Sequence, residues 1–302
     1  MPESRTADPK RICAGPKRHA PEEILRHQKF PLARQRFLDT VLALYHGDAL
    51  LTRLMVEAAR QVVFSAILCL DAGSDPDDPA TWPTLGLLKQ SMVQYGLSSP
   101  RRIDSLVALL THNGFLESTL SPYDRRLRIL RPTEKMRSTD RDWWAANFLP
   151  LQVMFPQPGY GEVIGRDPAF HRDLRRAAMR CFANGAQILG GNPDIMVFLE
   201  RDAGTLVLFR LAQLAGAPDS GAVELDYKDV GARFGVSRTH VQKILQDAAC
   251  ARLVEVSGRS VALMPRIWRA LDRFIVESMS GNDMLFNMAR RESETRARRA
   301  TA

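Results

Sequence analysis

The chain has 302 residues, of which 45% are apolar and 25% are charged, and its formal net charge is +8. This apolar content indicates a soluble globular chain with one large or two ordinary domains. No apolar run approaches the roughly 18 residues of a membrane span, so the sequence predicts no contact with membranes. The positive charge favours an anionic partner.

The four cysteines, Cys13, Cys69, Cys181 and Cys250, are far apart, with no CxxC pair and no histidine at ligand spacing. This spacing is not typical of a disulfide framework or of a zinc site, and it predicts no bound metal. The sequence also contains no nucleophile elbow and no phosphate-binding loop. We therefore expect no enzymatic activity, no catalytic residues and no cofactor.

Residues 1–20 place arginine and lysine among Pro, Gly and Ala, a composition that cannot bury enough apolar area to fold alone. We predict a flexible basic arm, which either lies along phosphate groups or acts as a solubilising tail. From residue 21 to 47 an amphipathic pattern predicts one or two helices, whose role the sequence does not tell. A broad apolar stripe predicts a strong helix over residues 50–70, and Thr84 is placed to cap another that runs to about residue 95.

Residues 95–118 combine a turn signal with a further helix. Gly96 supplies the turn, Ser98 stands just before the helix, and Pro100 fits the first helical position after Ser99. Ile103 and Leu106 have the spacing of an inward face. The residues left outside or at the helix start are candidate contacts to a partner: Ser98, Ser99, Arg101, Arg102 and Ser105.

The segment NGFLES, followed by SPYDRRLRILRPTEKM at residues 121–136, resembles the wing of the MarR family of transcription regulators. Asp124, Arg125 and Arg126 fill the family's D-R-R element, and residues 133–135 fill its helix start. The resemblance covers about residues 50–155. It implies a winged helix in which Arg126 enters the DNA minor groove and Asp124 orients it. A narrow groove independently favours arginine because its negative potential is enhanced. The alternative is a plain charged hairpin tip; the candidate contacts here are Arg125, Arg126 and Arg128.

Residues 148–165 are rich in Pro and Gly and indicate a boundary between two modules. Asp167 and Pro168 then open a helix predicted to run to about residue 189, and Asp202 is placed to cap another that runs to residue 214. In the first of these helices Phe170 and Leu174 point inward. We interpret the more exposed arginines as a solvated basic face: Arg172, Arg175, Arg176 and Arg180.

Residues 226–256 have the pattern of two helices joined by a tight turn and followed by a hairpin. Gly235 supplies a left-handed turn residue, and Ser237 can cap the second helix. In that helix Val241, Ile244 and Leu245 recur at three- and four-residue spacing. Its outward side carries side chains that suit base edges and phosphates. The candidate contacts are Ser237, Arg238, Thr239, Gln242 and Lys243, with Gln246 on the same side.

Residues 252–256 and 260–263 predict two short strands around a turn that contains Gly258 and Arg259, and Arg259 is a further candidate contact. The whole block resembles the winged helix-turn-helix of bacterial transcription regulators; the alternative is a small helical hairpin with a polar face. After the hairpin, Pro265 starts a terminal helix. We expect the basic tail, residues 281–302, to be frayed from about residue 289.

The two blocks match each other, which indicates an internal repeat. Gly96 pairs with Gly235 and Ser98 with Ser237, and, after one inserted residue, Ile103 and Leu106 pair with Val241 and Ile244. We therefore predict a mainly α fold with small β-wings, made of two winged helix-turn-helix domains in tandem joined by helices. The predicted divisions are the arm at 1–20, a domain at 21–155, connecting helices at 156–200, a domain at 201–280 and the tail at 281–302.

The function expected from this pattern is sequence-specific binding of double-stranded DNA by a bacterial transcriptional regulator, in the cytoplasm at the nucleoid. Because the chain is about twice as long as a usual MarR protein, it is expected to act as an intrachain pseudo-dimer, and a monomer and a homodimer both stay open. A plasmid-type replication initiator with two winged helices and a winged-helix scaffold for protein interactions are the alternatives. A small-molecule effector or a protein partner also stays open.

Overall fold

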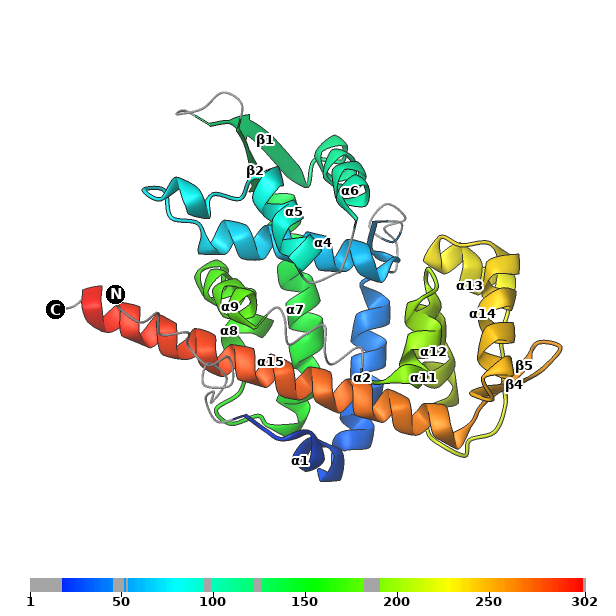
Figure 1. Cartoon of the computed structure of the whole chain (residues 1–302). Helices are drawn as coiled ribbons and strands as arrows, with labels where there is room; N and C mark the ends of the chain where they lie inside the picture. Colours follow the sequence, from blue (N-terminus) through cyan, green and yellow to red (C-terminus); the bar gives the residue numbers. More distant parts are fainter. Residues whose placement is uncertain are drawn as a thin grey trace, which may run out of the picture.

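The computed structural model describes residues 18–45, 52, 54–94, 99–121, 127–181 and 191–300. The described chain is mainly helical and contains two small antiparallel sheets, which confirms the predicted mainly α class with little β structure. None of the helices in these ranges is both long and apolar enough to cross a membrane. Figure 1 shows the hairpin β1–β2 and the hairpin β4–β5 at different ends of the molecule, with long helices between them.

Six helices make up the central part of the molecule. They are α1 (Pro21–Arg26), α2 (Phe30–Ala43), α7 (Glu134–Met154), α8 (Gly161–Ile164), α9 (Pro168–Arg180) and α15 (Pro265–Ala300). Helix α2 packs along α7, and α15 contacts α1, α2, α7 and α9 as it crosses the molecule (Figure 1). At about 1.5 Å per residue, the 36 residues of α15 span roughly 54 Å.

A first unit follows α2. It comprises α4 (Ala58–Gly73), the 3₁₀ turn η2 (Pro79–Thr81), α5 (Leu85–Gln94), α6 (Pro100–His112), β1 (Leu116–Leu120) and β2 (Arg128–Pro132). The side chain of Thr84 caps α5 by accepting from Leu87 N at 3.1 Å, as predicted. Strands β1 and β2 are antiparallel, and Thr84 forms an isolated bridge to Ile129 on the outer side of β2.

A second unit precedes α15. It comprises α11 (Pro193–Leu199), α12 (Gly204–Ala215), β3 (Val223–Glu224), α13 (Tyr227–Phe234), α14 (Arg238–Cys250), β4 (Val254–Ser257) and β5 (Ser260–Leu263). The three strands form an antiparallel sheet in the order β3-β5-β4. The two predicted helices and the hairpin that follows them are confirmed, and the short strand β3 precedes α13.

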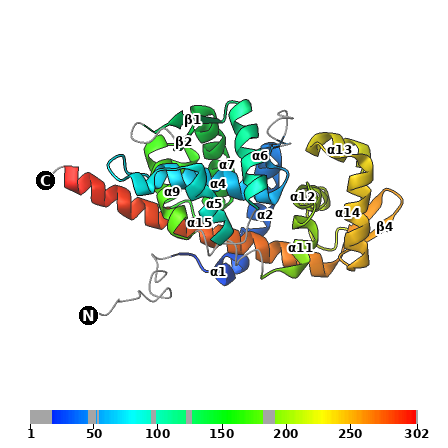
Figure 2. The same ribbon diagram turned by 45° about the horizontal axis from the view of Figure 1, so that its top comes forward.

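The two units share one order of elements: a helix, a short β segment, two helices, a hairpin and then a long helix. In both, the short segment pairs with the second hairpin strand, as Thr84 with Ile129 and Val223 with Val261. In the first unit the long helix is α7, which Thr133 caps by accepting from Met136 N at 3.3 Å. Its start therefore falls at the predicted Thr-Glu-Lys segment. In both views α6 lies on the side of the first unit that faces the second (Figures 1 and 2).

The buried apolar side chains form two clusters. The smaller belongs mainly to the first unit and includes Ile67, Leu88 and Phe115. The larger runs without interruption from α1 and α2 through α7, α9 and α15 into α12, α13 and α14. The second unit therefore shares its core with the central helices. The predicted domain boundaries do not follow this grouping, since α2 lies with the larger cluster, and they stay a prediction.

Several expected element ends are corrected. Helix α12 begins after Ala203, which has a left-handed φ of 60° and offers no side-chain cap, so Asp202 does not cap it. Helix α15 continues to Ala300 rather than fraying from residue 289. Helix α9 ends at Arg180, and residues 182–190 lie outside the described ranges.

Of the predicted arm, only residues 18–20 are described. There His19 N donates to Asp283 Oδ2 at 2.7 Å, so this end of the arm is bound to α15.

Candidate nucleic-acid interface

Helices α13 and α14 meet at a tight turn whose geometry follows from three residues. The Asp226 side chain caps α13 by accepting from Lys228 N and Asp229 N at 2.8 and 3.1 Å. Gly235 ends α13 in the left-handed region, with a φ of 68°. The Ser237 side chain caps α14 by accepting from His240 N at 3.1 Å. These contacts confirm the predicted turn and helix starts.

Gly231 is required for a reason that periodicity did not reveal. A Cβ at this position would lie 2.6 Å from the carbonyl oxygen of Val236, on the turn between the two helices. The same turn is closed by Val236 N, which donates to Gly231 O at 2.9 Å. Residue 231 therefore permits a close backbone approach that fixes the angle between α13 and α14.

Helix α14 has one buried face and one polar, exposed face. Val241, Ile244 and Leu245 are buried in the larger core. The opposite face carries side chains that are exposed and that make no hydrogen bond or ion pair within the described chain. They are Arg238, Thr239, Gln242, Lys243 and Gln246. Guanidinium, amide and ammonium groups suit base edges and phosphates, so this face is available to a nucleic acid.

The hairpin β4–β5 is tethered to the start of α13. Arg259 donates to Asp226 Oδ2 at 2.8 Å, and Tyr227 Oη donates to Gly258 O at 2.7 Å. The two backbone N–H groups that bind Asp226, helped by the nearby Arg259 guanidinium, lower the pKa of that carboxyl below its usual value. Arg259 thus fixes the position of the hairpin tip, while its side chain stays more than half exposed.

In the first unit, α6 presents a similar but less basic face. Ser99 caps α6 by accepting from Arg102 N at 3.4 Å, and Pro100 occupies the first turn. Arg101 and Arg102 are exposed and unpaired within the described chain. The Ser105 hydroxyl donates to Arg101 O at 3.1 Å, so its proton is already used.

The caps correct the expected match between the two units. Since Ser99 caps α6 as Ser237 caps α14, no residue is inserted between the cap and the helix, and Ser99 takes the place assigned to Ser98. In this alignment Arg102 falls opposite His240. Where α14 has Gln242, α6 has Asp104, which forms an ion pair with Lys89 at 2.6 Å. A carboxylate at the centre of the face weakens its attraction for phosphate.

The remaining predicted contacts lie on or beside the hairpin of the first unit. Arg128 begins β2 and is exposed. Ser98, Arg125 and Arg126 lie outside the described residues, as does Asp124. The minor-groove role that the MarR resemblance implies for Arg126 therefore stays a prediction.

A buried polar cluster between α4, α7 and α9 was missed in the sequence. Arg175, expected to be exposed, is only 3% exposed and donates through Nε to Asp140 Oδ2 at 2.7 Å, while His171 Nε2 lies 2.5 Å from the same oxygen. The Arg175 guanidinium also lies 5.0 Å from the Trp144 ring centroid. Burial opposes ionisation of Asp140, but the charge of Arg175 and the hydrogen bonds from His171 and Arg175 outweigh it, so the pKa of Asp140 lies below its usual value.

No cluster of three or more metal-ligating side chains occurs within the described ranges. Comparisons with protein families, with curated proteins and with solved structures found no match for this chain.

Proposed function

We propose that this chain binds double-stranded DNA through two winged-helix units and acts as a sequence-specific transcriptional regulator. The observation that carries the proposal is the outer face of α14, where Arg238, Gln242 and Lys243 are exposed and unpaired while the opposite face of the same helix is buried. A helix anchored in this way after a tight turn, with a hairpin beside it, has the arrangement with which helix-turn-helix proteins enter the major groove.

The repeated order of elements supports the second part of the proposal, that one chain carries both reading helices. Each unit has a short β segment, two helices and a hairpin in the same order, and each is followed by a long helix of the central part. Two such units in one chain take the place of the two subunits of a dimer. The net charge of +8 supplies the phosphate attraction that such binding needs.

One observation favours a different role for the first unit. Leu109 on α6, Leu120 at the end of β1 and Leu127 before β2 are 37%, 53% and 42% exposed. Exposed leucines together with the carboxylate of Asp104 suit a protein surface better than a phosphate backbone. In this alternative the second unit binds DNA and the first unit binds protein.

The proposal is tested by measuring the affinity of the full chain for duplex DNA as a function of salt. If about 6 phosphates are neutralised, log K falls with log salt at a slope of roughly −5. The variant Lys243→Ala should make this negative slope shallower by about one, because it removes one phosphate contact. The matched control is Arg36→Ala, which removes one positive charge from the exposed side of α2.

A tight duplex complex with a slope near zero contradicts phosphate-dominated binding. An equal effect of Lys243→Ala and Arg36→Ala contradicts the assignment of α14 as the DNA-contacting helix. Negligible duplex binding at moderate salt favours the scaffold.

A further inference from the structure

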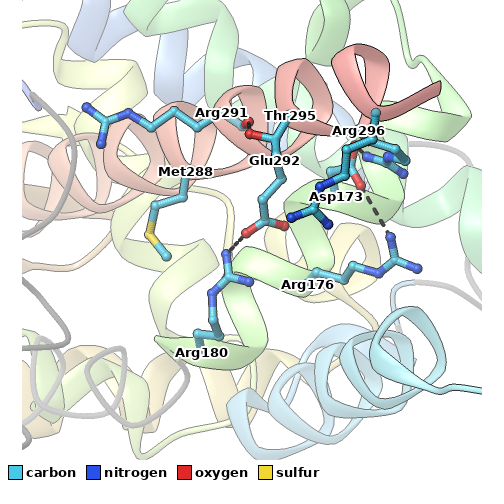
Figure 3. Close-up of a pocket in the computed structure, with 9 residues that line it drawn as sticks. Asp173, Arg176, Arg180, Met288, Arg291, Glu292, Thr295 and Arg296 are labelled. Carbon is cyan, nitrogen blue, oxygen red and sulfur yellow. Dashed lines mark hydrogen bonds and ion pairs between the residues drawn. The ribbon is translucent and has the colours of Figure 1, made fainter. Parts of the chain in front are cut away.

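An open hollow lies between α9 and the last turns of α15, and arginine dominates its lining (Figure 3). Its volume is about 520 Å³, within the roughly 300–1,000 Å³ that small-molecule sites occupy. Besides Met288 and Thr295, it is lined by two carboxylates, Asp173 and Glu292, and by five arginines. The arginines are Arg176, Arg180, Arg291, Arg296 and Arg299.

The carboxylates hold three of these arginines in place. Asp173 is 1% exposed and binds Arg296 from α15. It also lies 3.5 Å from Arg176 on its own helix, whose Nε donates to Ala72 O at 2.7 Å. Glu292 pairs with Arg180 across the hollow, as Figure 3 shows. Three guanidinium groups are thereby positioned before any ligand binds.

The other two arginines make no ion pair or hydrogen bond through their side chains within the described chain. Arg291 extends along α15 towards Met288 (Figure 3), and Arg299 lies two turns further along the helix. Five guanidinium groups against two carboxylates leave an excess of positive charge at the hollow. These guanidinium groups are partly fixed in position, and their excess positive charge favours binding of an anion that carries several charges.

We propose that this hollow binds a small oligophosphate, such as the phosphate chain of a nucleotide. Guanidinium groups present forked N–H donors that match phosphate oxygens in pairs, and several arginines around one hollow favour a ligand with more than one phosphate. A single phosphate could meet only part of a hollow this size.

The position of the hollow separates it from the proposed DNA-contacting face of the second unit. Its α15 residues begin at Met288, about 35 Å along the helix from Pro265, which directly follows the hairpin of that unit. Figure 1 shows α9 and the C-terminal end of α15 on the opposite side of the molecule from α14. None of its lining residues comes from α6 or the hairpin β1–β2. A free phosphate compound therefore fits the site better than the DNA backbone.

The hollow also adjoins the attachment of the first unit. Arg176 reaches the carbonyl of Ala72 at the end of α4, and Arg175, the preceding residue of α9, binds Asp140 of α7. A ligand in the hollow would therefore contact α9, the helix that is bonded to the end of α4.

The test is isothermal titration calorimetry of the full chain with sodium tripolyphosphate at moderate salt. Wild type should bind, and the double variant Arg291→Ala/Arg299→Ala should bind at least about tenfold more weakly, because two charge-assisted contacts are lost. Both arginines are exposed, and neither has an ion-pair partner within the described chain, so the fold should be unaffected. The matched control is Arg36→Ala/Arg269→Ala, which removes the same charge elsewhere and should change the affinity less than twofold.

Duplex DNA affinity is measured on the same proteins. The site is confirmed if Arg291→Ala/Arg299→Ala weakens tripolyphosphate binding but changes duplex affinity by less than about threefold. No binding by wild type, or equal weakening in the control, overturns the site. A parallel loss of duplex affinity also overturns it and assigns the hollow to the DNA backbone. Tripolyphosphate binding does not require DNA binding. The calorimetric result therefore still tests the hollow if the chain does not bind duplex DNA.

Discussion

The two units have the same order of elements but are attached to the rest of the molecule in different ways. The second unit shares one continuous apolar core with α2, α7 and α15. The first unit has its own core, to which α7 contributes Met136 and α9 contributes Met179, and it also meets α7 and α9 through directional polar contacts. Arg137 binds Asp71 at 2.9 Å, Arg176 binds the carbonyl of Ala72, and Arg175 lies beside Cys69.

This difference in attachment affects how firmly each unit is held against the central helices. An apolar interface tolerates small shifts poorly because its side chains interlock at crystal-like density. A buried ion pair, in contrast, depends on partners that must all be present. We infer that the second unit is held in a fixed position, whereas the position of the first unit depends on a few charged side chains around α9.

The largest expected effect comes from breaking the buried cluster. Arg175→Ala leaves the Asp140 carboxylate buried with only His171 beside it, and the free energy of unfolding should fall by about 3–5 kcal/mol. Urea denaturation measures this fall, and amide hydrogen exchange should rise more in α4–α6 than in α12–α14. Arg172→Ala is the control, because this exposed arginine on the same helix should change stability by less than about 0.5 kcal/mol. Equal exchange in the two units would contradict the difference in attachment.

A smaller effect is expected from one substitution made in both units. Gly231→Ala should destabilise the second unit by about 1–3 kcal/mol, because the new Cβ would meet the backbone oxygen of Val236 and the turn cannot move freely. Gly86→Ala in α5 places a Cβ at ordinary contact distance from Thr84 Oγ1, 3.8 Å, and should stabilise the first unit by roughly 0.5–1 kcal/mol. Thermal unfolding compares the two variants. Unchanged or increased stability in Gly231→Ala would show that the close approach at residue 231 does not constrain the turn.

The smallest effect concerns the charge of the first reading face. Asp104→Asn removes a carboxylate from the middle of α6 and frees the ammonium group of Lys89. Duplex affinity should rise by a factor of about three to ten, and the salt slope should steepen by up to about one. Fluorescence anisotropy at several salt concentrations measures both quantities. Unchanged affinity and slope would place α6 away from the phosphates and favour its role as a protein surface.

The local structure of the second unit was predictable from sequence because its signals are short-range. The glycine at 235, the serine cap at 237 and the spacing of Val241 and Ile244 each specify their own neighbourhood, and all three are confirmed. The need for glycine at position 231 was not predictable, since it arises from contact with a carbonyl beyond the end of α13.

Long-range contacts account for the other differences. Arg175 has the spacing of a surface residue on α9, and only the approach of Asp140 from α7 makes its burial favourable. The register between the units was misplaced by one residue because two serines stand in a row, and the sequence did not show which one accepts the hydrogen bond. The arginine hollow likewise requires the C-terminal end of α15 to lie against α9. The sequence did not predict the hollow, because this end of the helix was expected to be frayed.

The central claim, that two reading helices act in one chain, is tested most directly by selecting bound sequences from a random pool of duplex DNA. Wild type, Arg238→Ala and Arg102→Ala are compared. Arg→Ala at a paired guanine contact costs about 1–3 kcal/mol and relaxes the preference at one position. We expect each variant to change the selected motif in a different half-site. Unchanged motifs in both variants, or a change with Arg238→Ala alone, would show that the first unit does not read DNA and would contradict the pseudo-dimer.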